Sequence, residues 1–277
     1  MRGGYGWPTL FALAANLPHN AMTDARQQAE DHRRRVIGTK LARLEFARQH
    51  GKPAIATGFP ALDEALGIGG FPRGAMTEVF GPSSIGKTTL ALQWVAHLQG
   101  SAMAAAWIDA DHTFDAAYAA ALGVDLDQIP LMRPESAEEA LEMTRQLVLS
   151  GALDAVVIDS AAALAPRFEL EAGVDGGAGL HSRVLASGLK PLARAVTKSD
   201  TAILFLNQTR RRMDRPAGET ETSAGGPPLK LYASVRLVLE PAGGRSVRFR
   251  TLKNKAAGAF RDGVLRLGKP LGFAKTP

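Results

Sequence analysis

The residues with the clearest chemical meaning run from Gly81 to Thr89 and read Gly-Pro-Ser-Ser-Ile-Gly-Lys-Thr-Thr. Their spacing matches G-x-x-x-x-G-K-[ST], a loop whose backbone N–H groups cradle nucleotide phosphates. Lys87 is expected to reach the β- and γ-phosphates, and the Thr88 hydroxyl is expected to bind Mg²⁺. The candidate ATP-binding residues of this loop are Gly81, Pro82, Ser83, Ser84, Ile85, Gly86, Lys87, Thr88 and Thr89.

The sequence on either side supplies the strand and the helix that such a loop requires. Residues 76–80 form a short, mostly apolar run that ends at the loop and predicts a strand. Residues 89–98 repeat apolar side chains at helical spacing, namely Leu90, Leu92, Trp94, Val95 and Leu98. Because strand, loop and helix occur in the required order, a glycine-rich turn with a chance lysine is the weaker interpretation.

Aspartates end two other apolar runs. Asp159 follows the β-branched run at 155–158, where a Walker B aspartate would hold Mg²⁺ directly or through water. Asp111 follows the run at 104–108 and is the candidate for orienting or deprotonating the attacking water. Asp109 points to the same face but lies deeper in that strand. The alternative is that these aspartates only cap turns or face solvent.

Asp115 and Tyr118 lie on a short helix predicted at 115–122, directly after the aspartates. An aromatic ring at this place can stack on a nucleotide base, so both residues are candidates for ATP binding. Ordinary packing in the core is the alternative for the tyrosine.

A group of arginines follows the apolar run at 202–206, in a polar stretch predicted to be a loop from 209 to 226. Its members are Arg210, Arg211, Arg212 and Arg215. Cations on a loop beside a nucleotide site predict contacts with DNA phosphates that are salt-dependent and indifferent to base sequence. The alternative is a solvated run of charge.

Composition sets broad limits on the function. The chain has 277 residues, of which 45% are hydrophobic and 22% charged, as in a globular protein with a substantial core. It has no cysteine, which excludes disulfides and thiolate metal sites and is compatible with a cytoplasmic protein. The formal net charge of +6 leans towards polyanionic partners. No apolar run approaches the length of a membrane span, so we expect no membrane association.

Strands and helices alternate along the chain. The runs predicted as strands are 76–80, 104–108, 131–133, 155–158, 202–206, 235–239, 247–251 and 264–267. The segments predicted as helices are 89–98, 115–122, 136–149, 183–196 and 229–234, with a glycine-rich loop at 169–179. Because the first strands are apolar throughout, the pattern predicts a parallel sheet covered on both faces. Polar residues at the carboxyl ends of these strands mark the ligand-binding edge.

Three segments are expected along the chain. Residues 1–30 are interpreted as a flexible leader, with a start at Met22 or a secretory signal as alternatives. Residues 31–56 are expected to form a basic amphipathic helix and a linker, and the apolar stripe of that helix must dock on this chain or on a neighbouring one. Residues 57–277 are expected to form the ATPase core.

Several of these segments together resemble bacterial RecA, in its order, from about Thr57 to about Gly272. The residues that carry the resemblance are Thr57-Gly58 through Leu62-Asp63, the phosphate-binding loop, Ile108-Asp109-Ala110-Asp111-His112, Val157-Ile158-Asp159-Ser160, Phe205-Leu206-Asn207-Gln208, Leu229 through Leu237, and Lys253-Asn254-Lys255. The resemblance implies an α/β fold, a P-loop NTPase of the RecA type with a mostly parallel central sheet and helices on both faces.

The resemblance also implies roles for individual residues. Gln208 is similar to the residue that senses the γ-phosphate and relays its presence to a DNA-binding loop. Lys253 and Lys255 are similar to the pair that reaches a neighbouring subunit's γ-phosphate. Residues 169–179 match the first DNA-binding loop and residues 210–226 the second. Gly225 and Gly226 resemble a helix start that offers N–H groups to a DNA phosphate.

The chain departs from the family pattern in several places. Asp111 stands where the family has glutamate, so the attacking water is expected to be less well placed and turnover slower. Pro216-Ala217 replaces bulky apolar residues of the second loop, and the first loop is shortened. The segment after the N-terminal helix is short, and the sequence ends before the family's C-terminal domain.

The resemblance implies a DNA-dependent ATPase that uses ATP and Mg²⁺, binds single-stranded DNA and self-associates into a filament or homo-oligomer. Its setting would be homologous recombination, DNA repair and the SOS response in the cytoplasm. An alternative is an ImuA-type RecA-like accessory protein of SOS mutagenesis, with a repair polymerase or RecA as its partner. A small-molecule P-loop kinase is a weaker alternative, because it leaves the Lys253-Asn254-Lys255 segment unexplained.

Overall fold

The computed structural model describes residues 53–173, 177–211, 221–268 and 271–275. The chain divides into two units, Met1–Lys52 and Pro53–Pro277, and every described residue belongs to the second. The leader at 1–30 and the basic helix expected near 31–50 therefore lie outside the described residues. No helix in the described part is long and apolar enough to cross a membrane.

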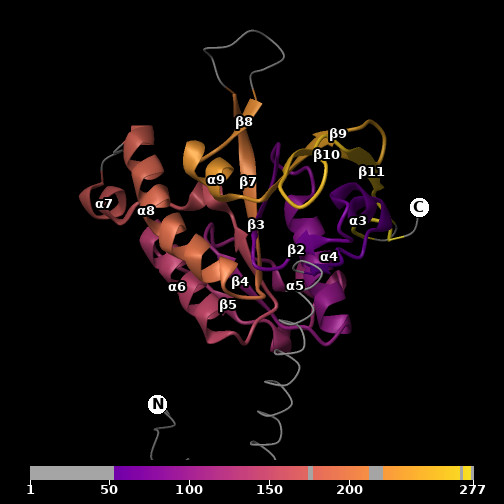
Figure 1. Cartoon of the computed structure of the whole chain (residues 1–277), viewed down its shortest axis with the longest axis horizontal. Coiled ribbons are helices and arrows are strands. Elements are labelled where there is room, and N and C mark those ends of the chain that lie inside the picture. Colours follow the sequence, from indigo (N-terminus) through magenta and orange to yellow (C-terminus); the bar gives the residue numbers. More distant parts are fainter. Residues whose placement is uncertain (1–52, 174–176, 212–220, 269–270, 276–277) are drawn as a thin grey trace, which may run out of the picture. The chain divides into compact units, whose positions relative to one another are not determined.

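A sheet of nine strands forms the centre of the described unit (Figure 1). The order is β11-β10-β9-β3-β7-β6-β4-β5, and β8 pairs with β7. The strands are β3 (Met76–Gly81), β4 (Ala105–Asp109), β5 (Leu131–Met132), β6 (Ala155–Asp159), β7 (Ala202–Arg211), β8 (Glu221–Ser223), β9 (Val235–Pro241), β10 (Ser246–Asn254) and β11 (Asp262–Arg266). Neighbours from β9 to β5 are parallel, whereas β10, β11 and β8 pair antiparallel. The mostly parallel sheet predicted from the sequence is confirmed.

Helices cover both faces of this sheet. They are α3 (Pro60–Leu66), α4 (Lys87–Gly100), α5 (Ala116–Ala121), α6 (Ala137–Ser150), α7 (Arg167–Ala172), α8 (Gly177–Thr197) and α9 (Pro227–Tyr232). Figure 1 shows α6 and α8 together on one side and α3, α4 and α5 on the other. A short separate sheet pairs β1 (Ala54–Ile55) with β2 (Phe71–Pro72).

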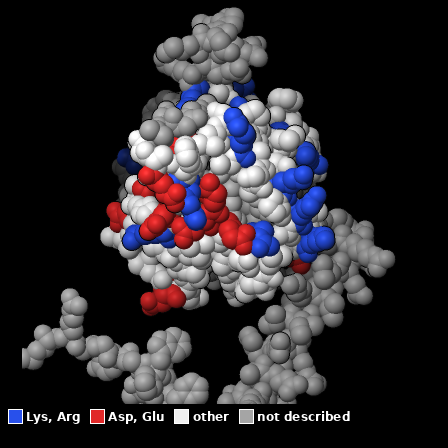
Figure 2. All heavy atoms as spheres, turned by 90° about the vertical axis from the view of Figure 1, so that its left-hand side faces the viewer, with Lys and Arg blue, Asp and Glu red and all other residues white. Residues whose placement is uncertain are grey.

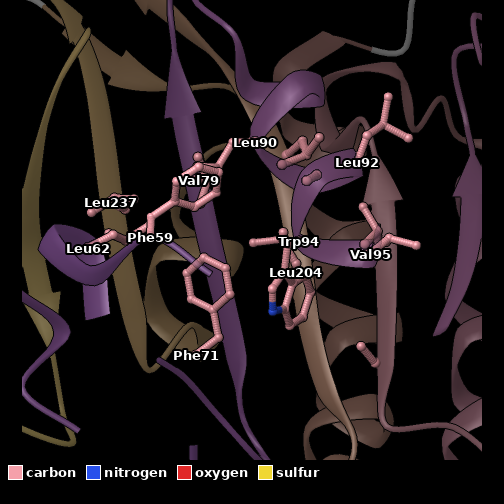
Figure 3. Packing of buried hydrophobic residues seen from close by; sticks show 14 of the residues in the cluster. Phe59, Leu62, Phe71, Val79, Leu90, Leu92, Trp94, Val95, Leu204 and Leu237 are labelled. Atoms are coloured by element: carbon pink, nitrogen blue, oxygen red, sulfur yellow. The ribbon is translucent and has the colours of Figure 1, made fainter. Parts of the chain in front are cut away.

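The two faces explain why the central strands are apolar throughout. In β6, Ala155 and Val157 pack into the cluster under α3 and α4, whereas Val156 and Ile158 pack into the cluster under α6 and α8. Successive side chains of a strand point to opposite faces, so a strand covered on both faces needs apolar residues at every position. In the first cluster, Trp94 and Phe71 meet edge to face with 5.0 Å between ring centroids (Figure 3).

Ser136 caps the helix predicted at 136–149. The Ser136 side chain accepts a hydrogen bond from the backbone N–H of Glu139, as an N-cap does. The Glu139 carboxylate, however, accepts from the N–H of Glu135 rather than from that of Ser136. The helix that follows, α6, lies close to α8. A Cβ added at Gly188 of α8 would lie 2.5 Å from Leu141 Cδ1 of α6, so only glycine fits there without a shift.

Two of the predicted loops are wrong in part. Residues 169–179 were expected to form a glycine-rich loop, but α7 extends to Ala172 and α8 begins at Gly177. Residues 209–226 were also expected to form a loop, but β7 extends to Arg211 and β8 pairs with it. In both segments, tertiary or cross-strand pairing outweighs the local preference of glycine and polar residues for turns.

Candidate nucleotide and DNA site

The phosphate-binding loop connects β3 to α4, as its motif requires. Lys87 is the first residue of α4 and is buried, and its ammonium donates to the carbonyl oxygens of Gly81 (3.1 Å) and Pro82 (2.7 Å). Burial lowers the pKa of this lysine, and the nearby Asp159 carboxylate opposes that effect. The ammonium is therefore held by neutral carbonyls, and a phosphate oxygen would be a stronger, charged acceptor for it.

Glycine is required at both glycine positions of the loop motif. Gly86 has φ +97°, and a Cβ added there would lie 2.7 Å from the Phe273 ring. A Cβ at Gly81 would lie 2.6 Å from the backbone oxygen of Leu239. Phe273 is itself fixed by Gln93 of α4, whose side chain accepts from its N–H (2.7 Å) and donates to its oxygen (3.0 Å). The 271–275 segment thus supports the loop, which sequence analysis did not foresee.

Thr88 and Asp159 meet beside the loop. The Thr88 hydroxyl donates a 2.9 Å hydrogen bond to Asp159 Oδ2 at the end of β6. Burial raises the pKa of Asp159 to about 6; the Thr88 hydrogen bond opposes this rise, and the Asp111 charge adds to it. Among the described residues, no group of three or more acidic or histidine side chains is placed to hold a metal ion by itself. A hydroxyl and a carboxylate beside a phosphate-binding loop fit Mg²⁺ that is also held by nucleotide oxygens.

The structure separates the roles of the two aspartates near β4. Asp109 is buried and accepts from the backbone N–H groups of Thr113 (3.0 Å) and Phe114 (3.3 Å) and from Arg133 Nε (3.0 Å). These bonds occupy its carboxylate in shaping the chain after β4. Asp111 is half-buried. Within the described residues its carboxylate accepts one hydrogen bond, from the Thr113 hydroxyl at 2.7 Å. Asp111 therefore stays the better candidate for a catalytic base.

Tyr118 reaches the helix that follows the loop. Its hydroxyl lies 2.7 Å from the Thr89 hydroxyl, and its ring packs against the apolar cluster under α4. Asp115 is exposed and caps α5 by accepting from the N–H of Tyr118 (2.9 Å). Tyr118 thus touches the helix that begins at the phosphate-binding loop, and Asp115 holds the first turn of α5; their part in ATP binding stays a prediction.

Gln208 lies between the phosphate-binding loop and the residues 210–215, here called the arginine segment. It is exposed on β7 and lies in register with Gly81 of β3. The same strand continues through Arg210, which is exposed, to Arg211, and pairs there with β8. Arg212 and Arg215 lie outside the described residues. The predicted sensor and the start of the predicted DNA-binding segment are thus on one continuous strand.

Gly225 and Gly226 join β8 to α9 with φ +81° and +74°, which favour glycine. A Cβ at Gly225 would also lie 2.9 Å from Leu185 of α8. The helix begins with Pro227 and Pro228, which have no N–H group. Donors to a phosphate at this place must therefore come mainly from the glycines, not from the first turn of α9.

Lys253 and Lys255 lie at the end of β10, two strands away from β3 in the sheet. The Lys253 ammonium donates to the carbonyl oxygens of Lys230 (2.7 Å) and Leu231 (3.0 Å), near the C-terminal end of α9. Burial lowers the pKa of Lys253, and the charges of Lys255 and Arg236 lower it further. Lys255 is exposed. The structure does not bring this pair to the chain's own phosphate-binding loop.

Sequence analysis missed a buried network formed by Glu78, Asn207 and Arg236. Glu78 lies on β3 and is fully buried, and its carboxylate accepts from Asn207 Nδ2 (2.8 Å) and Arg236 Nε (2.6 Å). A charged residue inside the apolar run at 76–80 was a visible signal. Its partners follow only from the pairing of β3 with β7 and β9.

Comparison with known proteins identifies what the chain is similar to. The family model described as RecA N-terminal domain matches residues 34–268. Protein RecA of Deinococcus radiodurans is 40% identical, and the alignment covers 92% of this chain and 75% of that protein. Protein RecA of Caulobacter vibrioides is 44% identical, with 84% and 72% covered. Protein RecA of Rubrobacter xylanophilus is 46% identical, with 76% and 64% covered.

Proposed function

The chain belongs to the RecA family, and from this premise we propose that it is an ATPase that binds single-stranded DNA and acts in recombination and repair. One observation carries the proposal: Gln208 lies in register with Gly81 of the phosphate-binding loop, on the strand that continues into the arginine segment. A change at the γ-phosphate can therefore reach the DNA-binding segment through a single strand.

In the proposed reaction, water attacks the γ-phosphate of ATP in line with the leaving oxygen. The loop N–H groups and Lys87 hold the phosphates, and Asp111 orients the water and accepts its proton. Mg²⁺, held by Thr88 and Asp159, would neutralise charge on the phosphate oxygens. Gln208 contacts the γ-phosphate and changes position when it is lost, while Tyr118 packs beside the base.

The proposed DNA contacts are electrostatic. Arg210 and Arg211, with Arg212 and Arg215, would bind backbone phosphates of single-stranded DNA, and Gly225 and Gly226 would add N–H donors. Such contacts do not read base sequence. They suit a protein that must bind any exposed single strand in the cytoplasm, where bacterial DNA lies.

Self-association is part of the proposal. A groove of about 700 Å³ on α6 has Met132, Met143 and Leu147 among its lining residues, with Glu138, Glu139 and Glu142 beside them. Figure 2 shows acidic side chains gathered on the face that carries α6 and α7 in Figure 1. We propose that the basic segment 31–50 of a second copy, with its apolar stripe, occupies this groove. Lys253 and Lys255 would then act on the nucleotide of a neighbouring subunit.

The accessory alternative gains no support from the comparisons, because the matched relatives carry the RecA name. The kinase alternative leaves the arginine segment and the Lys253-Asn254-Lys255 segment without a role. A direct test is binding of fluorescent oligo-dT with Mg²⁺ and a non-hydrolysable ATP analogue. The proposal predicts tight binding that weakens with ADP; equal binding with both nucleotides would contradict it.

A further inference from the structure

Both oxygens of the Glu78 carboxylate are used to hold the base of the β7–β8 hairpin. Oε1 accepts from Asn207 Nδ2 at 2.8 Å, and Oε2 accepts from Arg236 Nε at 2.6 Å. Asn207 and Arg236 each donate a second hydrogen bond, to a residue at or directly after the end of β8. Asn207 Nδ2 also donates to the oxygen of Ala224 (3.0 Å), and a terminal nitrogen of Arg236 donates to the Ser223 hydroxyl (3.1 Å).

The network ends beside the phosphate-binding loop. Glu78 precedes the first glycine of the loop by three residues on β3. The guanidinium carbon of Arg236 lies 4.8 Å from the centre of the Phe80 ring, next to that glycine. Arg236 thus contacts two positions of β3 with the same group that holds Ser223. A displacement of the last residues of β3 must move the base of the hairpin, or break a buried contact.

Because these groups are buried, breaking a contact between them would cost free energy. Glu78 is 0% exposed and Ser223 is 2% exposed, and the Arg236 side chain is 13% exposed. A buried charge that loses its partner is strongly destabilised, so the contacts are kept together when the strand shifts. The planar guanidinium reaches Glu78 and Ser223 with different nitrogens, which a lysine ammonium cannot do in the same geometry.

A structural role alone would explain an ion pair between β3 and β9, because these strands are neighbours in the sheet. It does not explain why both donors are shared with residues 223 and 224, which lie on the hairpin. The Arg73–Asp154 pair shows the contrast. It is buried and 2.8 Å long, but Arg73 precedes β3 and its second acceptor is the backbone oxygen of Asp200, away from the hairpin.

We propose that Arg236 is a positioning residue that, with Glu78 and Asn207, couples the nucleotide site to the DNA-binding hairpin through Ser223 and Ala224. The proposal rests on the proposed function. It adds a second connection to the one through Gln208. Coupling between two sites is reciprocal, so the same contacts set how much ATP raises the affinity for DNA and how much DNA raises the affinity for ATP.

The test measures this coupling as a ratio. Fluorescent oligo-dT is titrated with the full chain in Mg²⁺ and either a non-hydrolysable ATP analogue or ADP, and the two dissociation constants are divided. Ser223→Ala removes one hydroxyl and leaves the Glu78–Arg236 pair intact. Arg236→Lys keeps the charge but loses one of the two contacts. The loss of one hydrogen bond predicts that each variant lowers the ratio by roughly fivefold.

The controls separate coupling from folding. Arg73→Lys changes an arginine whose side chain is even less exposed, at 6%, and should keep the wild-type ratio. Analogue binding without DNA should stay within about twofold of wild type in both test variants, since none of the changed groups is placed to touch the nucleotide. If Arg236→Lys does not fold, Ser223→Ala decides alone. A wild-type ratio in Ser223→Ala overturns the inference. Absence of any nucleotide effect in the unchanged protein would instead overturn the proposed function, and this inference with it.

Discussion

The Thr88 hydroxyl lies 2.9 Å from a carboxylate oxygen of Asp159, so the first turn of α4 and the end of β6 meet at one point. These residues are 71 positions apart in the sequence. The contact joins the loop that would hold the phosphates to the carboxylate that would hold Mg²⁺.

Asp159 predicts a pH dependence of stability in the metal-free protein. Burial raises its pKa to about 6 from the ordinary value of 3.8, so the folded protein binds the proton more tightly than the unfolded chain does. The stabilisation is present below the unfolded pKa and is lost as the pH rises through about 6. An asparagine at this position would not titrate, so the Asp159→Asn variant should not lose stability in this way. The free energy of unfolding of the variant minus that of the wild type should therefore rise between about pH 4 and 7, by up to about 3 kcal/mol.

Urea unfolding in EDTA at several pH values measures the effect on Asp159. A difference between wild type and Asp159→Asn that stays constant over this range would show that the carboxylate is not protonated on burial. A difference that grows toward acid would reverse the sign and contradict the account.

Asp111 is predicted to limit turnover through its length. It stands where the family has glutamate, and its carboxylate is drawn toward the Thr113 hydroxyl at 2.7 Å. Asp111→Glu should raise the DNA-stimulated turnover several-fold, because the longer side chain reaches further toward the water. Asp111→Asn should lower it by roughly a hundredfold, as expected for loss of a general base. Steady-state ATP hydrolysis measures both, and slower turnover in Asp111→Glu would contradict this role.

Arg210 is predicted to contact a DNA phosphate. Arg210→Ala should weaken binding of oligo-dT and of mixed-sequence DNA equally. It should also reduce the slope of log affinity against log salt by about 0.7, the value for one phosphate of a single strand. Lys198→Ala is the control, since Lys198 is an exposed cation near the opposite end of β7. Equal slopes in wild type and Arg210→Ala would remove Arg210 from the interface.

The α6 groove predicts where a second copy binds. Leu147 lines the groove, whereas Leu149 on the same helix is 55% exposed and does not line it. Leu147→Asp should weaken self-association at least tenfold, since burial of a leucine contributes about 1.5–3 kcal/mol. Leu149→Asp should have little effect. Light scattering with an ATP analogue measures the assembly size, and equal sizes for the two variants would contradict the groove assignment.

The parallel sheet could be predicted because its strands are short, apolar and buried on both faces. Met76–Gly81 and Ala155–Asp159 match the predicted runs to within one residue. The phosphate-binding loop could be predicted equally well, because its function depends on residue types at fixed spacing within one local segment. Local signals of this kind do not need knowledge of the rest of the fold.

Other features depend on contacts between distant segments. The extension of β7 to Arg211 is polar, because beyond Gln208 its partner is β8 and not the core of the sheet. Helix α8 begins at Gly177, where glycines suggested a loop, and its buried residues Leu185 and Leu189 pack against the sheet with α6. Helix α3 was not predicted, although Pro60 at its start and Gly67 at its end, with φ +73°, were readable signals.

The proposed activity is tested most directly by ATP hydrolysis with and without single-stranded DNA. Lys87→Ala is the control, since Lys87 is the cation held inside the phosphate-binding loop. Single-stranded DNA should stimulate turnover strongly, and Lys87→Ala should abolish it. ATP and DNA binding without stimulated turnover, or turnover that survives Lys87→Ala, would contradict it.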